Sequence, residues 1–259
     1  MWGSIIGDLA GSIYEYDQTK EVHLVEVNKI IEDNAFYSDD TIMTVAMADA
    51  ILNGGKYKDY IKKYGFNYID YHPDFKPYFR FSFSPGFLNW LVKNKANKSI
   101  GNGALMRISP VGFMYNDEKE ISHEVFKSTS VTHDTYEAIN SSLLVALIIY
   151  YFRTGLTKEE VLEKLKIKLK YRPFNKFNTT CSETLGNVLY AVFKSNSYED
   201  TIKNVISFGG DTDTNACIAG GMAEALYGVP EELIAKAKEY IPEEFTKVLT
   251  RAYNYKKHM

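Results

Sequence analysis

Residues 209–230 read GGDTDTNACIAGGMAEALYGVP and join an acidic loop to a run of small and apolar residues. The run over residues 214–227 predicts a buried helix, and the Gly-Val-Pro that follows it is a usual helix stop. Two aspartates, Asp211 and Asp213, stand at the start of this helix beside two threonines and two glycines. One aspartate is enough to cap a helix, so this composition favours metal ligation over capping alone.

A second acidic motif, Ser38-Asp39-Asp40-Thr41, precedes a segment whose apolar residues recur at helical spacing between positions 42 and 51. On its own the motif is a good N-cap sequence, because acids are favoured at the positive end of the helix dipole. Together the two motifs supply four carboxylates, and like charges gathered at one spot cannot all ionise cheaply without a counter-ion. The pair of motifs therefore predicts bound divalent cations, two Mg²⁺ or Mn²⁺ ions, which prefer oxygen ligands.

The N-terminal residues 3–15 predict a helix that carries glycine at every fourth position. These glycines would give the helix a smooth face for close packing against a neighbour. Asp8 and Glu15 are seven residues apart and would lie on one side of the helix. They are either surface charges or buried acids, and a buried acid is costly unless it is paired or bound to a metal.

Two further segments offer polar groups to a substrate. The segment Ser99-Ile100-Gly101-Asn102-Gly103-Ala104-Leu105-Met106-Arg107 contains glycines whose backbone N–H groups could contact a phosphate, although many loops contain Gly-Asn-Gly. Arg107 suits a structural ion pair as well as a phosphate contact. His133 stands at the start of a predicted helix, where a lone histidine is usually a cap or a packed residue.

Helical periodicity dominates the rest of the chain and predicts helices over residues 133–152, 157–169, 231–238 and 243–253. Strand signals are sparse, and residues 22–27 fit either a short strand or a loop. Residues 64–86 are rich in aromatic residues and proline, so we expect an irregular loop near a binding surface. Since no linker or repeat marks a boundary, the sequence predicts one all-α domain over residues 1–259, a compact helical bundle.

Composition and charge exclude several classes of protein. The 259 residues are 45% hydrophobic and 24% charged, as in ordinary globular proteins, and the net charge of -3 gives no reason to expect nucleic-acid binding. The longest apolar run, residues 143–152, is too short to span a bilayer, and no secretory signal is visible. Cys181 and Cys217 lie in apolar surroundings and are expected to be reduced core residues. We therefore expect a cytoplasmic monomer without membrane contact.

Five of these segments occur together, in this order, in one known family. The chain resembles the ADP-ribosylglycohydrolases, which are related to dinitrogenase reductase-activating glycohydrolase. The resemblance runs from about residue 3 to residue 230 and rests on Gly7-Asp8 with Glu15, Ser38-Asp39-Asp40-Thr41, the loop from Gly101 to Arg107, Thr132-His133 followed by Glu137-Ala138, and Gly209-Gly210-Asp211-Thr212-Asp213-Thr214.

The resemblance implies an all-α bundle with a binuclear Mg²⁺ or Mn²⁺ centre at the bottom of a cleft. By the match, Glu15 lies near the water that the metal ions activate, and Ser99 stands where some members carry an aspartate, so no catalytic role is carried over to that position. Ser38 stands where threonine is common, and either hydroxyl can bind a metal. The implied metal ligands are Ser38, Asp39, Asp40, Asp211, Asp213 and Thr214. The implied substrate-binding residues are Gly101, Asn102, Gly103, Ala104, Met106 and His133.

The function expected from the resemblance is hydrolysis of the glycosidic bond between ADP-ribose and a modified protein side chain or a small acceptor. Asp39 or Glu15 would accept the proton of the attacking water. Two alternatives remain open from the sequence: a metal-dependent phosphoesterase that acts on a nucleotide diphosphate, and a non-catalytic module that binds ADP-ribose. The acceptor, the choice between Mg²⁺ and Mn²⁺, and the identity of the general base also remain open.

Overall fold

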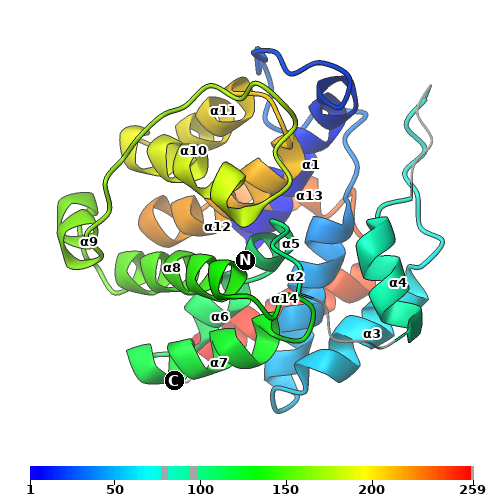
Figure 1. Cartoon of the computed structure of the whole chain (residues 1–259), viewed down its shortest axis with the longest axis vertical. Helices are drawn as coiled ribbons and strands as arrows, with labels where there is room; N and C mark the ends of the chain where they lie inside the picture. The colour runs from blue at the N-terminus through cyan, green and yellow to red at the C-terminus, as the bar shows by residue number, and fades with distance from the viewer. Residues whose placement is uncertain (77–80, 94–97, 258–259) are drawn as a thin grey trace.

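The computed structural model describes residues 1–76, 81–93 and 98–257, and these residues form helices joined by loops (Figure 1). The helices of the first half are α1 (Trp2–Gln18), α2 (Asp39–Leu52), α3 (Tyr57–Asn67), α4 (Pro85–Lys93), α5 (Gly103–Met106), α6 (Ser109–Met114) and α7 (Glu118–Thr129). Those of the second half are α8 (Tyr136–Arg153), α9 (Lys158–Lys164), α10 (Cys181–Lys194), α11 (Tyr198–Ser207), α12 (Thr212–Tyr227), α13 (Glu231–Ala237) and α14 (Glu243–Lys257). The only extended pairings among the described residues are two isolated bridges, so the all-α prediction is confirmed.

The closest packing in the described structure is between α1 and α12. Gly3 lies against Gly220, Gly7 against Ala216, and Gly11 against the backbone of Thr212. Because the numbers rise along one helix and fall along the other, the two helices run antiparallel. A Cβ atom at any of these three glycines would overlap with a backbone carbonyl of α12. The smooth glycine face predicted for the first helix is therefore the surface on which α12 packs.

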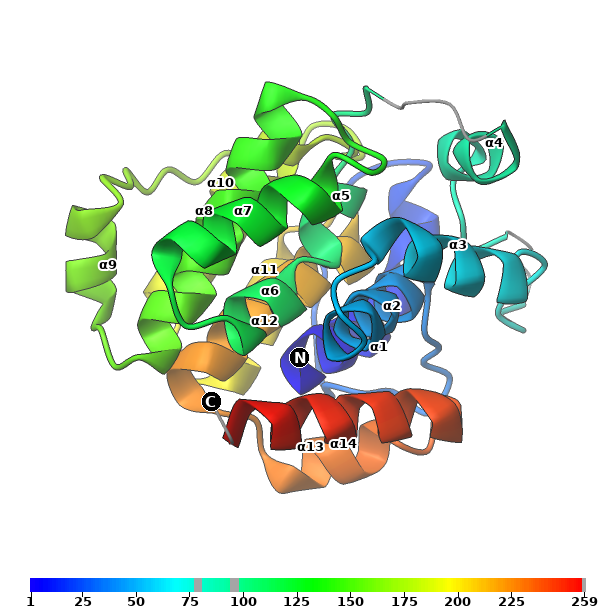
Figure 2. The ribbon, with the colours of Figure 1, turned by 90° about the horizontal axis from the view of Figure 1, so that it is seen from below.

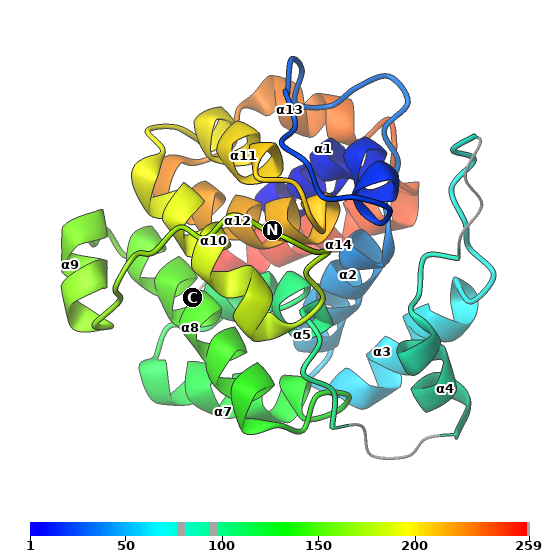
Figure 3. The ribbon, with the colours of Figure 1, turned by 45° about the horizontal axis from the view of Figure 1, so that its top comes forward.

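The other helices surround this central pair. Helices α2, α11 and α13 pack against α1, and α8, α10 and α11 pack against α12. Figure 2 shows α14 lying across the bundle beneath α2, which it contacts. Figure 3 shows α9 at one edge of the molecule and α3 with α4 at the opposite edge. The pair α1 and α12 is thus buried on most sides, as their residues' low exposure requires.

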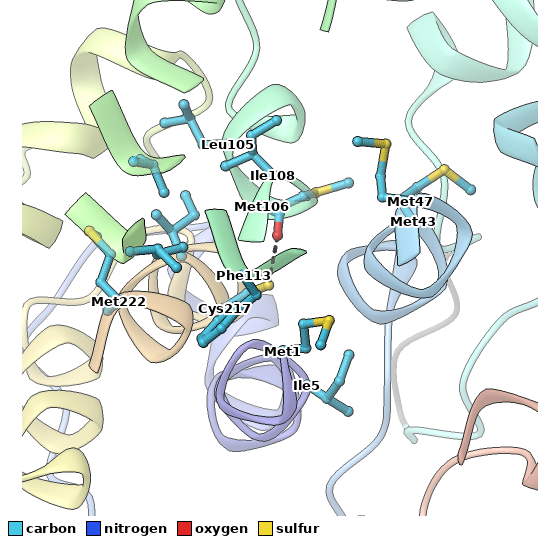
Figure 4. Packing of buried hydrophobic residues seen from close by; sticks show 14 of the residues in the cluster. Met1, Ile5, Met43, Met47, Leu105, Met106, Ile108, Phe113, Cys217 and Met222 are labelled. Carbon is cyan, nitrogen blue, oxygen red and sulfur yellow. Dashed lines mark hydrogen bonds between the residues drawn. The ribbon is translucent and has the colours of Figure 1, made fainter. Parts of the chain in front are cut away.

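The space between α1, α2, α6 and α12 is filled by aliphatic and sulfur-containing side chains (Figure 4). Met43 and Met47 extend from α2, and Met106 lies between them and α12. The thiol of Cys217 donates a hydrogen bond of 3.3 Å to the backbone oxygen of Met106. Cys181 is also buried with a free thiol, so both cysteines are the core residues that the sequence predicted.

Helix α14 extends beyond the predicted end at residue 253 to Lys257, and two other predicted helix boundaries were wrong because capping residues override the apolar pattern. Helix α8 begins at Tyr136 and not at His133, since Thr135 is extended and its hydroxyl accepts from the N–H of Ala138. Helix α9 has the predicted capping box at Thr157, but it ends at Lys164, well before residue 169. The chain turns there because Lys166 adopts a φ of 53°, which terminates a right-handed helix.

The loop predictions hold in part. Within residues 22–27 there is no strand, and Val25 donates one backbone hydrogen bond of 3.1 Å to Ser207. The predicted irregular region over residues 64–86 overlaps the end of α3 and the start of α4, while residues 68–76 and 81–84 form no helix. Residues 77–80 of that region lie outside the described residues. The assignment of residues 1–259 to one domain stays a prediction.

The sequence also predicted that the chain does not contact a membrane. Within the described residues, none of the helices combines the length and the apolar character that crossing a bilayer demands.

The contact between α1 and α12 can be tested with a pair of glycine substitutions. Gly7→Ala inserts a methyl group between two backbones that cannot move apart without disturbing the core, so we expect a loss of about 3 kcal/mol in the free energy of unfolding. Urea unfolding followed by circular dichroism measures the change.

Gly186→Ala in α10 is the matched control, because the nearest atom to its added methyl would lie 3.8 Å away. This control should be neutral or slightly stabilising, since alanine favours helix more than glycine by about 1 kcal/mol. Equal stability of the two variants would contradict the proposed role of the glycine face.

Candidate active site

A cavity of about 610 Å³ opens where the N-terminal ends of α2 and α12 meet α1 and the loop before α5. Part of the lining is acidic and is formed by carboxylates from α1 and from the N-terminal ends of α2 and α12. The lining also includes the aromatic side chains of Phe81, Phe83 and Phe177. The carboxylates that line the cavity are Glu15, Asp39, Asp40, Asp211 and Asp213.

A first acidic cluster joins Asp8, Asp40 and Asp213, whose nearest carboxylate oxygens all lie within 4.8 Å of one another. Four donors hold Asp8: the backbone N–H and the hydroxyl of Ser38 at 2.9 and 2.8 Å, and those of Thr41 at 3.0 and 2.5 Å. Burial, followed by repulsion from Asp213, still raises the pKa of Asp8 to about 7. Even with four donors, the charge on Asp8 therefore lacks a compensating cation.

A second acidic cluster joins Glu15, Asp211 and Asp213 under the same distance limit. Asp213 belongs to both clusters, so the two form one continuous acidic surface. The side-chain amide of Asn102 donates to Asp211 at 2.6 Å, which ties the loop before α5 to this surface. Burial and the charges of Asp213 and Glu15 raise the pKa of Asp211 well above its ordinary value.

The hydrogen bonds around these carboxylates fit a metal site and not helix caps. Ser38, not Asp39 or Asp40, caps α2 by accepting from the N–H of Asp40. Asp211 occupies the N-cap position of α12, yet its side chain makes no capping hydrogen bond. Among the described residues, the buried Oδ1 of Asp40 has no hydrogen-bond partner, although Oδ2 accepts from Thr214 and lies 3.1 Å from the hydroxyl oxygen of Ser38.

A buried carboxylate oxygen without a partner costs free energy unless a ligand binds to it. The donor set consists of carboxylate and hydroxyl oxygens, which suit a hard divalent cation. The buried acidic clusters can therefore hold a metal ion.

The structure brings most of the sequence-predicted ligands together and adds one. Asp40, Asp211 and Asp213 lie in the clusters, and the hydroxyls of Ser38 and Thr214 contact Asp40. Asp39 lines the cavity outside both clusters, and the hydroxyl of Ser82 donates to it at 3.4 Å. The ligand and catalytic roles of Asp39 therefore stay predictions.

Asp8 was not among the predicted ligands, although it completes the first cluster. Its signal in the sequence was an acid inside an apolar, glycine-containing helix. Glu15, predicted as a candidate catalytic base, lies with the second cluster, so the two carboxylates of α1 belong to the same acidic surface, as expected from their spacing.

The predicted substrate-binding loop borders the acidic surface and lines the same cavity. Gly101, Asn102, Gly103, Met106 and His133 line the cavity, whereas Ala104 is buried outside its lining. Burial, helped by the charge of Arg107, lowers the pKa of His133 to about 3, so its imidazole is neutral at physiological pH.

Phe177 and Thr179 also line the cavity, although neither was predicted from the sequence. Their segment carries no periodicity, and only the fold brings it to the cavity.

The central helices of this bundle gather buried carboxylates that can hold metal ions, and most of them line a cavity large enough for a small-molecule substrate. The family model for ADP-ribosylglycohydrolase matches residues 1–257, and the chain belongs to this family. The resemblance drawn from the five sequence motifs is thereby confirmed, and with it the prediction of an ADP-ribosyl glycohydrolase.

Curated relatives agree with this assignment. An ADP-ribosylarginine hydrolase Tri1 from Pseudomonas putida (strain GB-1) is 27% identical over 278 residues, which cover 90% of this chain and 72% of the relative. The ADP-ribosylhydrolase ARH3 of Homo sapiens is 24% identical over 311 residues, covering 88% of this chain and 84% of the relative. A solved structure titled ADP-ribosylglycohydrolase-related protein complex superposes with a TM-score of 0.71 at 18% identity and covers 98% of both chains, which supports the fold.

The raised pKa of Asp8 predicts how metal binding changes the pH dependence of stability. Without metal, the folded chain holds a proton on Asp8 up to about pH 7, whereas the unfolded chain releases it near the ordinary value of 3.8. The folded state therefore binds more protons over this range, and its stability falls as the pH rises. Melting temperatures in EDTA should decline between about pH 4 and about pH 7, the range between the two pKa values.

Saturating Mn²⁺ should flatten or reverse this decline, because a bound cation compensates the ionised carboxylates and competes with protons for them. Melting temperatures are measured over the same pH range in Ca²⁺-free buffer with and without Mn²⁺, and the two curves are compared. Parallel curves in EDTA and in Mn²⁺ would contradict metal binding at Asp8.

Proposed function

We propose that this chain removes ADP-ribose from a modified protein side chain or small acceptor, using two Mg²⁺ or Mn²⁺ ions to hydrolyse the glycosidic bond at C1″. The observation that carries the proposal is the pair of buried acidic clusters that share Asp213 at the floor of the cavity. Two clusters joined by one carboxylate suit two neighbouring cations. Family membership supplies the class of reaction.

The clusters indicate which residues would hold the ions. Asp8, Asp40 and Asp213 would hold one ion, and Glu15, Asp211 and Asp213 the other, with Ser38 and Thr214 as further ligands inferred from the sequence. Such ions, when bound, act as Lewis acids that fix substrate hydroxyls and lower the pKa of water.

Asp39 is the better candidate for the general base. It lines the cavity outside both clusters, so its carboxylate is not committed to a cluster, whereas Glu15 belongs to the second one. In the proposed reaction, water forms a bond to C1″ as the bond from C1″ to the acceptor breaks, through an oxocarbenium-like state. Asp39 accepts the proton of the water, and this proton is later returned to the departing acceptor.

The other residues that line the cavity would bind the rest of the substrate. Asn102, Gly101 and Gly103 present polar groups, and Met106 with the aromatic side chains of the lining offers apolar surface. Phe81, Phe83 and Phe177 supply faces on which a nucleobase can stack.

Arginine-linked ADP-ribose is the first substrate to test, since the relative from Pseudomonas putida is named for it. A monomeric state and a cytoplasmic location remain predictions from the sequence.

The reaction is tested by mass spectrometry of the products formed from arginine-, serine- and nucleotide-linked ADP-ribose, with Mg²⁺ or Mn²⁺ and with EDTA. We expect free ADP-ribose only when metal is present. Asp213→Asn should lower the rate at least about a hundredfold, because Asp213 is shared by both clusters.

Asp33→Asn is the matched control, because Asp33 is exposed and forms a surface ion pair with the nearby Lys29, away from the cavity. It should keep wild-type activity. Release of AMP would indicate the phosphoesterase alternative, and binding of ADP-ribose without any product would indicate the binding module.

The choice between the two candidate bases can be made by comparing Asp39→Asn with Glu15→Gln. If Asp39 is the base, Asp39→Asn lowers kcat by about a hundredfold or more while calorimetry still detects Mn²⁺ binding. Glu15→Gln should weaken Mn²⁺ binding as well as kcat, since Glu15 lies in a cluster. Loss of Mn²⁺ binding in Asp39→Asn would reassign Asp39 as a ligand.

A further inference from the structure

Three buried side chains form a line of hydrogen bonds that ends at the cavity. The guanidinium of Arg107 donates from Nη2 to the hydroxyl of Thr132 at 2.6 Å, and this hydroxyl lies 2.7 Å from Nδ1 of His133. The exposed fraction is 2% for Arg107, 1% for Thr132 and 8% for His133. The line joins the end of α5 to the turn before α8, and its two end members, Arg107 and His133, both line the cavity.

The chemistry of the three groups fixes the position of each proton. A guanidinium only donates, so Thr132 must accept from Arg107. The hydroxyl has one proton, and within the described residues its second hydrogen-bond partner is Nδ1 of His133. If Nδ1 carried a proton, the hydroxyl proton of Thr132 would be buried without an acceptor, which is costly. Thr132 therefore donates to Nδ1, and the neutral ring carries its proton on Nε2.

The Nε2 atom of His133 faces the glycine loop at the cavity. A Cβ atom added to Gly101 would lie 3.5 Å from Nε2, and one added to Gly103 would lie 3.8 Å from it. Both glycines line the cavity with His133, and the space that their missing side chains leave gives a ligand access to Nε2. The Nε2–H group is thus a donor directed at the substrate side.

The charge beside this donor selects the kind of acceptor. Burial alone lowers the pKa of Arg107 to about 10, and no carboxylate contributes to that shift. The guanidinium therefore stays charged at physiological pH without an acidic partner among the described residues. A buried positive charge of this kind favours a negatively charged oxygen nearby. Such an oxygen is present in the diphosphate of the proposed substrate and absent from an uncharged sugar.

We propose that Thr132, oriented by Arg107, is a positioning residue that holds His133 as the Nε2–H tautomer, so that His133 donates a hydrogen bond to a phosphoryl oxygen of the substrate. This inference rests on the proposed function for the identity of the substrate. The proton positions follow from the hydrogen bonds alone and can be measured without turnover.

The tautomer is measured first, by long-range ¹H–¹⁵N NMR of the histidine side chains in the full chain. His133→Gln identifies the His133 signals by their loss. We expect the Nδ1 signal of His133 to be that of an unprotonated nitrogen and the Nε2 signal that of a protonated one, across the neutral pH range. Protonation at Nδ1 would overturn the inference.

The acceptor is tested in the same spectrum by adding inorganic diphosphate, ADP-ribose or D-ribose. The Nε2 signal should move with diphosphate and with ADP-ribose, and it should stay in place with D-ribose. A response to D-ribose alone would overturn the assignment of a phosphoryl oxygen. This experiment remains decisive if no substrate is hydrolysed, so a failure of the proposed function and a failure of the inference give different results.

Substitutions then separate the positioning role from a general structural one. Thr132→Val removes the proton donated to Nδ1, so we expect mixed tautomers and a KM several-fold higher with little change in kcat, while Thr132→Ser restores both. His133→Gln keeps an N–H near the position of Nε2, whereas His133→Asn does not reach it and should raise KM by about tenfold. A wild-type tautomer and KM in Thr132→Val, or equal KM values for the two His133 variants, would overturn the proposal.

Discussion

The contact between the backbones of α1 and α12 is the constraint on which the rest of the structure depends. Glycines at positions 3, 7 and 11 let the two helices approach until each lies directly on the other's carbonyl groups. Larger side chains would hold the axes further apart, since helices usually pack at 8–10 Å or so depending on the side chains between them. The approach determines where Asp8 and Glu15 meet Asp213, so the acidic surface is a product of helix packing.

The close packing of α1 against α12 also gathers carboxylates in the interior, where their ionisation is unfavourable. Asp8, Asp40, Asp211 and Asp213 are buried, and each of the first three has a raised pKa because burial and neighbouring carboxylates oppose ionisation. The surrounding polar groups only partly compensate, as the unpartnered oxygen of Asp40 indicates. A fold selected for stability alone would place apolar residues here. The retained carboxylates therefore point to ligand binding, and the family assignment agrees with that interpretation.

The sequence predicted those parts of the molecule that depend on short-range patterns. The end of α12, the capping box of α9 and the glycine face of α1 are local features, and each lies as predicted. The predicted start of α8 was wrong because the capping signal is the single residue Thr135, whereas the apolar run that follows it is long and dominates the prediction. Cavity residues such as Phe177 depend on contacts between distant segments, for which a single sequence carries no periodic signal. The bond between Arg107 and Thr132 likewise spans 25 residues and was visible only in three dimensions.

The central helix pair also constrains the order in which the chain folds. Helix α1 is synthesised long before α12, and the hydroxyl of Thr212 donates to the backbone oxygen of Gly11 across a separation of 201 residues. Such long-range contacts close a large loop and form slowly compared with local ones. Until α12 is synthesised, the glycine face of α1 has no partner, and a nascent chain exposes apolar surface of the kind that chaperones protect. The acidic floor of the cavity is therefore assembled late in biosynthesis, after most of the chain has already been made.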